Sequence, residues 1–250
     1  MIVDEAPRRG PENMALDHAL AAGLAGDRGV LRLYSWSPRT VSFGRNEPAL
    51  GLYDRTAAEA EGIAFVRRPT GGRAVLHAEE ITYAVTLPAR ALGGVRAAYL
   101  AIHRGLVAGL RALGAAADVA REWAPLRPDA GPCFQGPTAG EVVAAGRKLV
   151  GSAQVRFGGA LLQHGSLILD GDQRALARLR GGGADPAPPA TLRGLIGPVD
   201  APAVARALAD GLGLALGGEW SKGGYSPEQL ETAYRFERER YGTEAWTWRR

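Results

Sequence analysis

The sequence predicts an α+β fold, and two observations support this class. Short segments rich in Leu, Val, Tyr and Phe follow one another with only a turn between them, as in β-hairpins. Segments with helical periodicity flank these groups and do not alternate regularly with single strands, which argues against βαβ winding. The chain has 250 residues, of which 46% are hydrophobic. This is enough to bury one large core, so we expect a single domain over residues 1–250.

The N-terminal part shows one clear helix and several strand-like segments. Leu16, Leu20 and Leu24 recur at a spacing of four, which predicts a helix over residues 13–25. β-Branched and aromatic residues predict the strands that follow, and a short helix divides them into two groups. We expect strands at 31–36, 40–44, 63–67, 74–76 and 81–87, and the short helix at 54–61.

The remaining elements follow the same two patterns. Apolar residues that step by three and four predict a helix over residues 96–113, which Gly114 ends. Residues 124–140 contain four prolines and predict a loop. Beyond it we expect a hairpin over 141–155 that turns near Ala145 and Gly146, a strand at 160–169, and helices at 201–213 and 226–238.

The composition excludes several classes of protein. The net charge is +4 and the basic residues are scattered, so we expect no nucleic-acid binding; a basic surface suits acidic protein partners. The single cysteine, Cys133, excludes an internal disulfide and a cysteine cluster, and no spacing of His, Asp and Glu indicates a metal site. No apolar run is long enough to span a membrane, and the N-terminus lacks a signal-peptide pattern. We therefore expect a cytoplasmic protein.

Lysine is rare, and this makes each lysine informative. Of the thirty basic residues only Lys148 and Lys222 are lysines, which indicates a compositional bias towards arginine. A lysine that remains under such a bias is a candidate for chemistry that needs a compact amine, because guanidinium stays charged and is planar. The alternative is that both are ordinary surface residues.

A glycine-containing segment over residues 67–77 is the first candidate site. Two adjacent glycines allow backbone N–H groups to approach a ligand closely, and the flanking arginines suit a carboxylate or a phosphate. The segment matches neither the P-loop nor the dinucleotide-binding pattern. A glycine turn with solvated arginines is the alternative. The candidate residues here are Arg68, Thr70, Gly71, Gly72, Arg73 and His77.

Cys133 and Lys148 form a candidate pair. A thiol in a Pro/Gly-rich loop can act as a nucleophile if a cation favours its thiolate form, and Lys148 follows fifteen residues later, across a predicted hairpin. Its ammonium could also stabilise an oxyanion on a thioester. An incidental thiol and an exposed lysine are the alternatives. His164 interrupts an apolar strand, where a buried structural histidine is more common than a catalytic one.

Taken in order, these segments resemble the biotin/lipoate protein ligase superfamily, with most similarity to its cysteine-dependent octanoyltransferase branch. The strongest segment is Arg-Arg-Pro-Thr-Gly-Gly-Arg-Ala-Val-Leu-His at 67–77. Each segment alone has low specificity, whereas the set in register is highly specific. The resemblance covers residues 11–17, 33–38, 41–45, 67–77, 81–83, 133–134, 146–154 and 162–166, and it returns at 244–247.

The resemblance implies mixed and antiparallel sheets flanked by helices, and it implies transfer of an octanoyl group from acyl carrier protein to a lysine. The acceptor would be a lipoyl domain or a glycine-cleavage H-type protein. Cys133 would carry the acyl chain as a thioester, with Lys148 at the acyl carbonyl. The implied substrate-binding residues are Arg68, Thr70, Gly71, Gly72, Arg73, His77, Gly151, Ser152, Ala153, Gln154, His164 and Gly165. Because thioester exchange is close to isoenergetic, no cofactor is expected.

On this interpretation the single catalytic domain has three parts. The acyl-site core would cover residues 11–170, a Gly/Pro-rich connection would cover 181–190, and a helical part would cover 191–250.

Three other functions remain open. An ATP-dependent lipoate–protein ligase is the first alternative, although Arg73 stands where ligases often have a third glycine. Octanoyl amidotransfer between lipoyl-type domains is the second, and a non-catalytic acyl-binding protein is the third.

Overall fold

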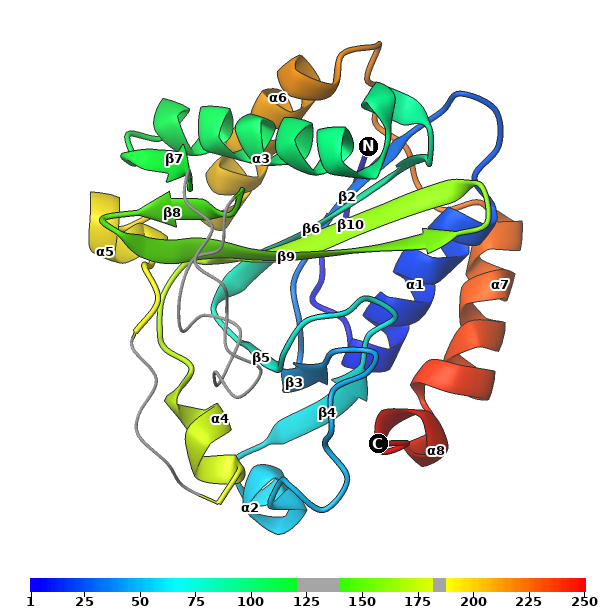
Figure 1. Ribbon diagram of the computed structural model, residues 1–250, viewed down its shortest axis with the longest axis vertical. Coiled ribbons are helices and arrows are strands. Elements are labelled where there is room, and N and C mark those ends of the chain that lie inside the picture. The colour runs from blue at the N-terminus through cyan, green and yellow to red at the C-terminus, as the bar shows by residue number, and fades with distance from the viewer. Residues whose placement is uncertain (121–139, 182–187) are drawn as a thin grey trace.

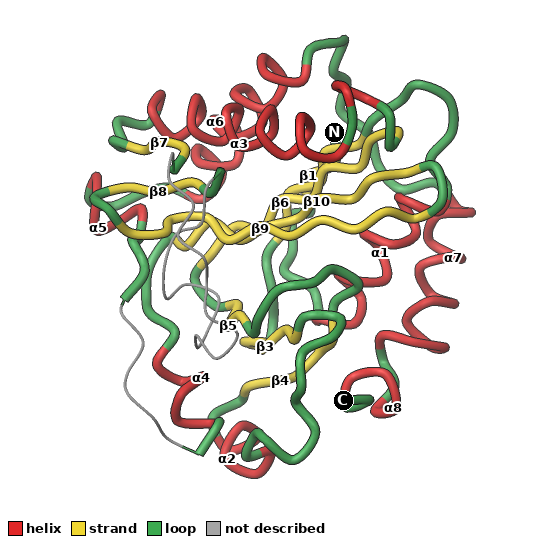
Figure 2. Tube along the Cα trace, in the orientation of Figure 1, coloured by secondary structure: helices red, strands yellow, loops and turns green. Residues whose placement is uncertain are grey.

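The computed structural model describes residues 1–120, 140–181 and 188–250. Within these ranges the chain forms a seven-stranded sheet and a three-stranded sheet. Figures 1 and 2 show the smaller sheet beneath the larger one, with helices on the outer side of each. The fold is therefore α+β, as predicted.

The larger sheet is mixed, because its first pair of strands is parallel and the other pairs are antiparallel. The longest strands lie in its middle, where both faces are covered. In spatial order the strands are β1 (Ile2–Val3), β2 (Val30–Tyr34), β6 (Glu80–Pro88), β10 (Ala160–Ile168), β9 (Arg147–Phe157), β8 (Val142–Ala144) and β7 (Ala117–Val119).

The smaller sheet has the order β4 (Ile63–Arg67), β3 (Arg39–Phe43) and β5 (Val75–His77). β3 pairs in parallel with β4 and antiparallel with β5. Mixed pairing in both sheets, with helices at the periphery, is the arrangement that the resemblance implied.

Two helices cover one face of the larger sheet, α3 (Val95–Ala112) and α6 (Ala201–Leu216) (Figure 1). They approach closely because glycines face each other: a Cβ on Gly109 would lie 2.3 Å from the carbonyl oxygen of Ala207. Apolar side chains of both helices pack on β2, β6 and β10 in the main core cluster. A side chain at Gly109 would force the helices apart, so this contact requires glycine.

The opposite face of the larger sheet carries α1 (Gly10–Ala22), with α7 (Pro227–Phe236) packed outside it (Figure 1). Met14, Leu16 and Ala19 of α1 pack against Ala84 of β6 and Leu162 of β10. A π-helical turn, Glu237–Tyr241, continues α7. The shorter helices are α2 (Arg55–Ala60), α4 (Arg174–Leu179), α5 (Leu192–Ile196) and α8 (Glu244–Thr247), and a 3-10 turn spans Ala91–Gly93.

Most periodic elements were predicted correctly, including the long helix α3 and the strands β4, β6 and β10. The predicted hairpin turn is also confirmed, since Ala145 and Gly146 have φ values of 48° and 70°. The predicted first helix begins too late: α1 starts at Gly10, because Pro11 fits the first turn, where a missing N–H costs nothing. In the described part of the chain, no helix is long and apolar enough to cross a membrane.

Candidate active site

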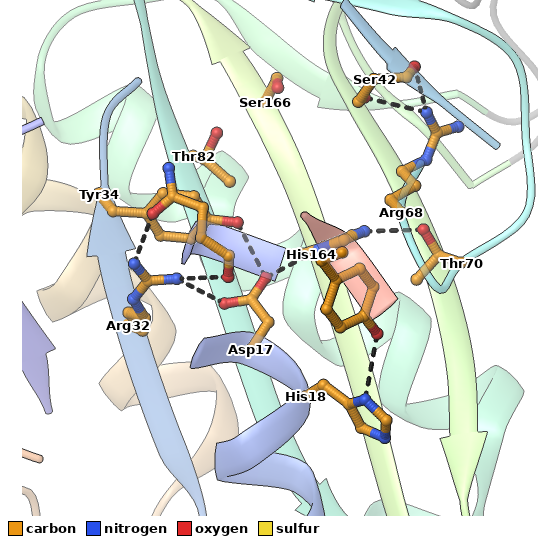
Figure 3. Close-up of polar contacts among 12 residues, drawn as sticks. Asp17, His18, Arg32, Tyr34, Ser42, Arg68, Thr70, Thr82, His164 and Ser166 are labelled. Carbon is orange, nitrogen blue, oxygen red and sulfur yellow. Dashed lines mark hydrogen bonds and ion pairs between the residues drawn. The ribbon is translucent and has the colours of Figure 1, made fainter. Parts of the chain in front are cut away.

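A cavity lies between the two sheets. One wall consists of cavity-facing residues of β2, β6, β10 and β9, and the other consists of β3, β5 and the turn that follows β4. Figure 3 shows Tyr34, Thr82, His164 and Ser166 on the first wall and Ser42 and Arg68 on the second. The lining residues are Met14, Tyr34, Trp36, Ser42, Arg68, Gly72, Val75, His77, Thr82, Gly151, Ser152, Ala153, His164, Gly165 and Ser166.

Strand register explains why these side chains share one face. Residues directly opposite each other in antiparallel strands project to the same side of a sheet. Two adjacent rows cross the larger sheet and carry most of the first wall. One row is Tyr34, Thr82, Ser166 and Gly151, and the other is Arg32, Ala84, His164 and Ala153.

Asp17 of α1 is the centre of a buried network beside the cavity (Figure 3). Its carboxylate accepts hydrogen bonds from Arg32 Nη1 at 2.8 Å and from Tyr34 Oη at 2.8 Å, and lies 3.0 Å from His164 Nδ1. The other ring nitrogen of His164 lies 2.7 Å from Thr70 Oγ1. Burial raises the pKa of Asp17, but the His164 hydrogen bond and the Arg32 charge outweigh it and hold that pKa below its usual value. Asp17 is therefore ionised and fixes the orientation of His164.

Arg68 shapes the glycine turn instead of projecting freely from it. Its guanidinium donates to the backbone oxygen of Ser42 at 2.9 Å, and to those of Gly71 and Arg73 at 2.8 Å each. The turn is tight: Gly72 has a φ of 90°. A Cβ on Gly44 of the neighbouring loop would lie only 1.8 Å from the Gly72 carbonyl oxygen. The two adjacent loops thus depend on glycine for their close approach.

His77 ends β5 on the second wall and contacts both sheets. Its Nε2 lies 2.7 Å from Ser42 Oγ, and its Nδ1 lies 2.8 Å from Glu80 Oε1. The imidazole stacks on the Trp36 indole with ring centroids 3.9 Å apart. Trp36 is itself held by a hydrogen bond from its indole N–H to Thr82 Oγ1. The ring of His77 is therefore held by a polar partner at each nitrogen and by the Trp36 indole on one face.

Lys148 does not line this cavity but is buried three residues before Gly151 on β9. Its ammonium lies 2.6 Å from Glu141 Oε1, and both side chains are less than 8% exposed. A carboxylate at this distance favours the charged form of a lysine. Cys133, the other predicted catalytic residue, lies outside the described residues, so its distance to Lys148 stays a prediction.

The structure brings most of the predicted substrate-binding residues to the cavity. Those that line it are Arg68, Gly72, His77, Gly151, Ser152, Ala153, His164 and Gly165. Thr70, Gly71 and Arg73 are not among the lining residues. Thr70 is buried and contacts His164, and Gly71 and Arg73 lie on either side of Gly72 in the turn. Gln154 points away, because its side-chain amide donates to Gln163 and to the backbone of Val95.

Several polar residues of the site were missed from the sequence. They are Asp17, Arg32, Tyr34, Ser42, Glu80, Thr82 and Ser166. One signal was present: Arg32 lies between Leu31 and Leu33 in a strand, and Asp17 lies in an apolar helix, although charged residues are rarely buried without a partner. Across the described residues, no group of three or more His, Cys, Asp or Glu side chains is placed to hold a metal ion.

Two buried histidines make stability depend on pH. His18 stacks between Phe157 and Phe236 with centroids 4.0 Å away on each side, and burial lowers its pKa from 6.5 to about 4. Burial lowers the pKa of His103 in the same way, to about 4. Between pH 6.5 and about 4 the unfolded chain binds these two protons and the folded chain does not. The free energy of unfolding therefore has its full contribution from both histidines above pH 6.5 and falls as the pH drops towards 4.

Urea unfolding at several pH values tests this expectation. The unfolding midpoint should fall between neutral pH and pH 5, and a His18→Gln variant should show a shallower fall, because one of the two titrating groups is gone. A midpoint that is constant or rises over this range would contradict it.

The chain is similar in sequence to a known family and to curated proteins. Residues 9–208 match the family model described as the lipoyl protein ligase A/B catalytic domain. The octanoyltransferase LipM of Kyrpidia tusciae is 41% identical over 263 residues, which cover 95% of this chain and 94% of the relative. The octanoyltransferase LipM of Symbiobacterium thermophilum is 44% identical over 188 residues, which cover 71% of this chain and 68% of the relative.

Solved structures share the fold. A putative lipoate protein ligase from T. acidophilum with bound lipoic acid superposes with a TM-score of 0.81 at 21% identity, covering 100% of this chain and 97% of that one. Lipoate-protein ligase A bound with ATP gives a TM-score of 0.84 at 21% identity, covering 99% and 97%.

Proposed function

The chain belongs to the lipoyl protein ligase A/B catalytic domain family, and on this premise we propose how it works as an octanoyltransferase of protein lipoylation. It takes an octanoyl group from octanoyl-acyl carrier protein, holds it as a thioester on Cys133, and passes it to a lysine of a lipoyl domain or glycine-cleavage H-type protein. The observation that carries this proposal is identity of 41% along 95% of the chain to a protein named octanoyltransferase LipM. The likeness to ligase structures, at 21% identity, concerns the fold alone.

The chemistry needs a nucleophile and a group that stabilises negative charge. The Cys133 thiolate attacks the donor thioester, and the acyl group moves from one sulfur to another with little change in free energy. Attack by the acceptor amine then gives an amide, which is downhill and needs no nucleotide. Both tetrahedral intermediates carry an oxyanion, and the buried Lys148 ammonium, kept charged by Glu141, is suited to stabilise it.

The cavity supplies a place for the octanoyl chain. Its walls include apolar groups of Met14, Val75 and Ala153, and Gly151, in the row of Thr82 and Ser166, adds no side chain to it. A narrow apolar cavity with a few fixed polar groups at its edge is typical of a site for a small apolar ligand. We propose that the chain lies here with its carbonyl towards β9, the strand that carries Lys148.

A cluster of arginines near the cavity suits acidic protein partners. Arg249 and Arg240 lie over the Trp246 ring, at 4.2 and 4.9 Å from its centroid. Burial and the charges of Arg250, Arg45 and Arg240 lower the pKa of Arg249, which indicates how closely these cations gather. The backbone N–H of Arg45 donates to the Thr70 oxygen at 2.7 Å, so the cluster adjoins the cavity turn. Such a surface attracts acidic carrier domains.

A mass-spectrometric experiment tests the proposed function. The purified protein is incubated with octanoyl-acyl carrier protein and no ATP, and we expect an octanoyl adduct on Cys133 that disappears when a lipoyl domain is added. A strict requirement for ATP and a free acid would favour a ligase. Loading from an octanoylated H-type protein, but not from acyl carrier protein, would favour an amidotransferase. Because a free catalytic thiol requires a reducing compartment, we propose a cytoplasmic location.

A further inference from the structure

A chain of hydrogen bonds crosses the larger sheet on the face that α3 covers. Gln154 Nε2 donates to Gln163 Oε1 at 2.7 Å, and Gln163 Nε2 donates to Tyr83 Oη at 2.8 Å. Tyr83 Oη lies 2.7 Å from Ser152 Oγ, which in turn lies 2.8 Å from His103 Nε2. The chain of hydrogen bonds thus links β9, β10 and β6 to His103 of α3.

The far end of this chain fixes the direction of its hydrogen bonds. The Gly140 carbonyl oxygen can only accept, so His103 Nδ1, which contacts it, carries a proton. Burial lowers the pKa of His103 to about 4, so the ring is neutral near neutral pH and Nε2 accepts the hydroxyl proton of Ser152. The Ser152 oxygen then accepts from Tyr83, whose oxygen accepts from Gln163. His103 is therefore held in one tautomer.

Gly140, where the chain of hydrogen bonds ends, has a backbone conformation that favours glycine. Its φ is 90°, and a Cβ there would lie 3.2 Å from the ring of Tyr99 on α3. Its N–H donates to the Ala120 oxygen at 2.8 Å, and the Ala120 N–H donates to the Glu141 oxygen at 2.8 Å. Because His103 also holds the Gly140 oxygen, the backbone is fixed on both sides of the peptide bond between residues 140 and 141.

Glu141, the residue that follows, is the partner of Lys148. Because Glu141 Oε1 lies 2.6 Å from Lys148 Nζ, the position of the ammonium depends on the position of the Glu141 backbone. Building on the proposed function, in which Lys148 stabilises the oxyanion, we propose that His103 is a positioning residue for this ammonium. His103 fixes the Gly140 oxygen, this contact fixes Glu141, and Glu141 fixes Lys148. The role of His103 is indirect and involves no proton transfer.

A neutral His103 suits this role, because the positive charge is needed on Lys148. Burial and the charge of Lys148 both disfavour a second proton on His103. A charged ring would also donate from Nε2, and the Ser152 hydroxyl could no longer donate to it. From the neighbouring elements, Glu141 before β8 and Tyr83 of β6 face this pair, and burial raises the pKa of Tyr83, so its hydroxyl stays neutral.

Two substitutions of His103 separate the roles of its two nitrogens. In His103→Asn the amide nitrogen takes the place of Nδ1 and can still donate to Gly140, whereas in His103→Gln it takes the place of Nε2 and cannot. Single-turnover loading from saturating octanoyl-acyl carrier protein should slow roughly 100-fold in His103→Gln, the effect of displacing a catalytic group by about 1 Å, and less than about fivefold in His103→Asn. His18→Gln, at a second histidine whose pKa burial lowers to about 4, should load as wild type.

The pH profile of loading distinguishes positioning from general damage. In wild type the loading rate should rise with pH as Cys133 ionises and then stay level to about pH 9. In His103→Gln, Glu141 no longer lies beside Lys148, and burial then favours loss of the lysine proton, so the loading rate should fall again towards about pH 9. A variant that is only less stable would lose rate at every pH and would show no such fall.

Ser152→Ala tests the same chain without changing a side chain of the helix core. Without the hydroxyl proton, Nε2 of His103 can carry the ring proton itself, and Nδ1 then turns a lone pair towards the Gly140 oxygen. Loading should slow roughly 10-fold, the equivalent of one ordinary hydrogen bond, and should show the same fall at high pH. Ser152→Thr keeps the hydroxyl and should restore the wild-type profile.

The outcomes separate this role from the proposed function. If the wild-type protein forms no octanoyl adduct, the proposed function is overturned, and the role of His103 with it. If the adduct forms and His103→Gln loads at the wild-type rate, only the role of His103 is overturned. Equal slowing of His103→Gln and His103→Asn, with no fall at high pH, would also overturn it, because such a result indicates packing alone. Where the His103 variants do not fold, a wild-type profile in Ser152→Ala overturns it.

Discussion

Replacing Cys133 with alanine is expected to lower octanoyl transfer by roughly 1000-fold or more, because the covalent intermediate can no longer form. The measurement is the initial rate at which a lipoyl domain gains the octanoyl group, followed by mass spectrometry. The octanoyl adduct on the enzyme should disappear in the same sample. Both losses have one cause, the missing sulfur, and they should appear together.

Two controls make this result interpretable. The thermal midpoint of Cys133→Ala should match that of wild type, which would separate loss of chemistry from loss of folding. Cys133→Ser keeps the size and the hydrogen-bonding capacity of the side chain but has a much weaker nucleophile, so it should also be inactive in loading. Transfer near the wild-type rate in Cys133→Ala would refute the thioester mechanism.

The Arg32→Met variant is expected to lose about 3–5 kcal/mol of stability, because it leaves the buried carboxylate of Asp17 without its arginine partner. Arg32 is fully buried and donates to Asp17 at 2.8 Å and to Asp4 at 2.6 Å. Asp4 keeps its ion pair with Arg8 at 3.2 Å, whereas the fully buried Asp17 loses its arginine partner. Methionine fills a similar volume, so the loss reports charge and not a cavity. The free energy of unfolding in urea measures it.

A matched set of variants separates this charge effect from general damage. Arg39→Met, at the exposed start of β3, should change stability by less than about 0.5 kcal/mol. Adding Asp17→Asn to Arg32→Met should recover part of the loss, since the carboxylate that lost its arginine partner is removed. A loss below about 1 kcal/mol for Arg32→Met would mean that the ion pair of Arg32 with Asp17 contributes little to the free energy of unfolding.

Periodic elements were predicted well because their signal is local. The apolar spacing within α3 and the alternation of β6 are properties of neighbouring residues, and the positive φ at Gly146 follows from its own turn. β1 has two residues and exists because β2 provides its hydrogen-bond partners. A two-residue strand has no periodicity to detect, so such elements become visible only in the tertiary structure.

The site residues also differ in whether their signal is local. Glycines and the residues next to them could be identified from the sequence, because a glycine segment indicates close backbone approach without reference to distant residues. The charge partners could not be identified in this way. Asp17 meets Arg32 and His164 from three separate elements, and the sequence separation of Asp17 and His164 is 147 residues. Only the pairing of β6 with β2 and β10 makes them neighbours.

β6 places Thr82 at the cavity and Glu80 against the cavity residue His77, and it places Ile81 and Tyr83 in the opposite core, so consecutive residues face different sides of the sheet. Gaining or losing one residue in the short turn at 78–79 would exchange these two sets. The Glu80 carboxylate would then enter the apolar core beneath α3, and isoleucine would take its place beside His77. Engineering of substrate choice should therefore proceed by point substitution along this strand, with the length of its preceding turn left untouched.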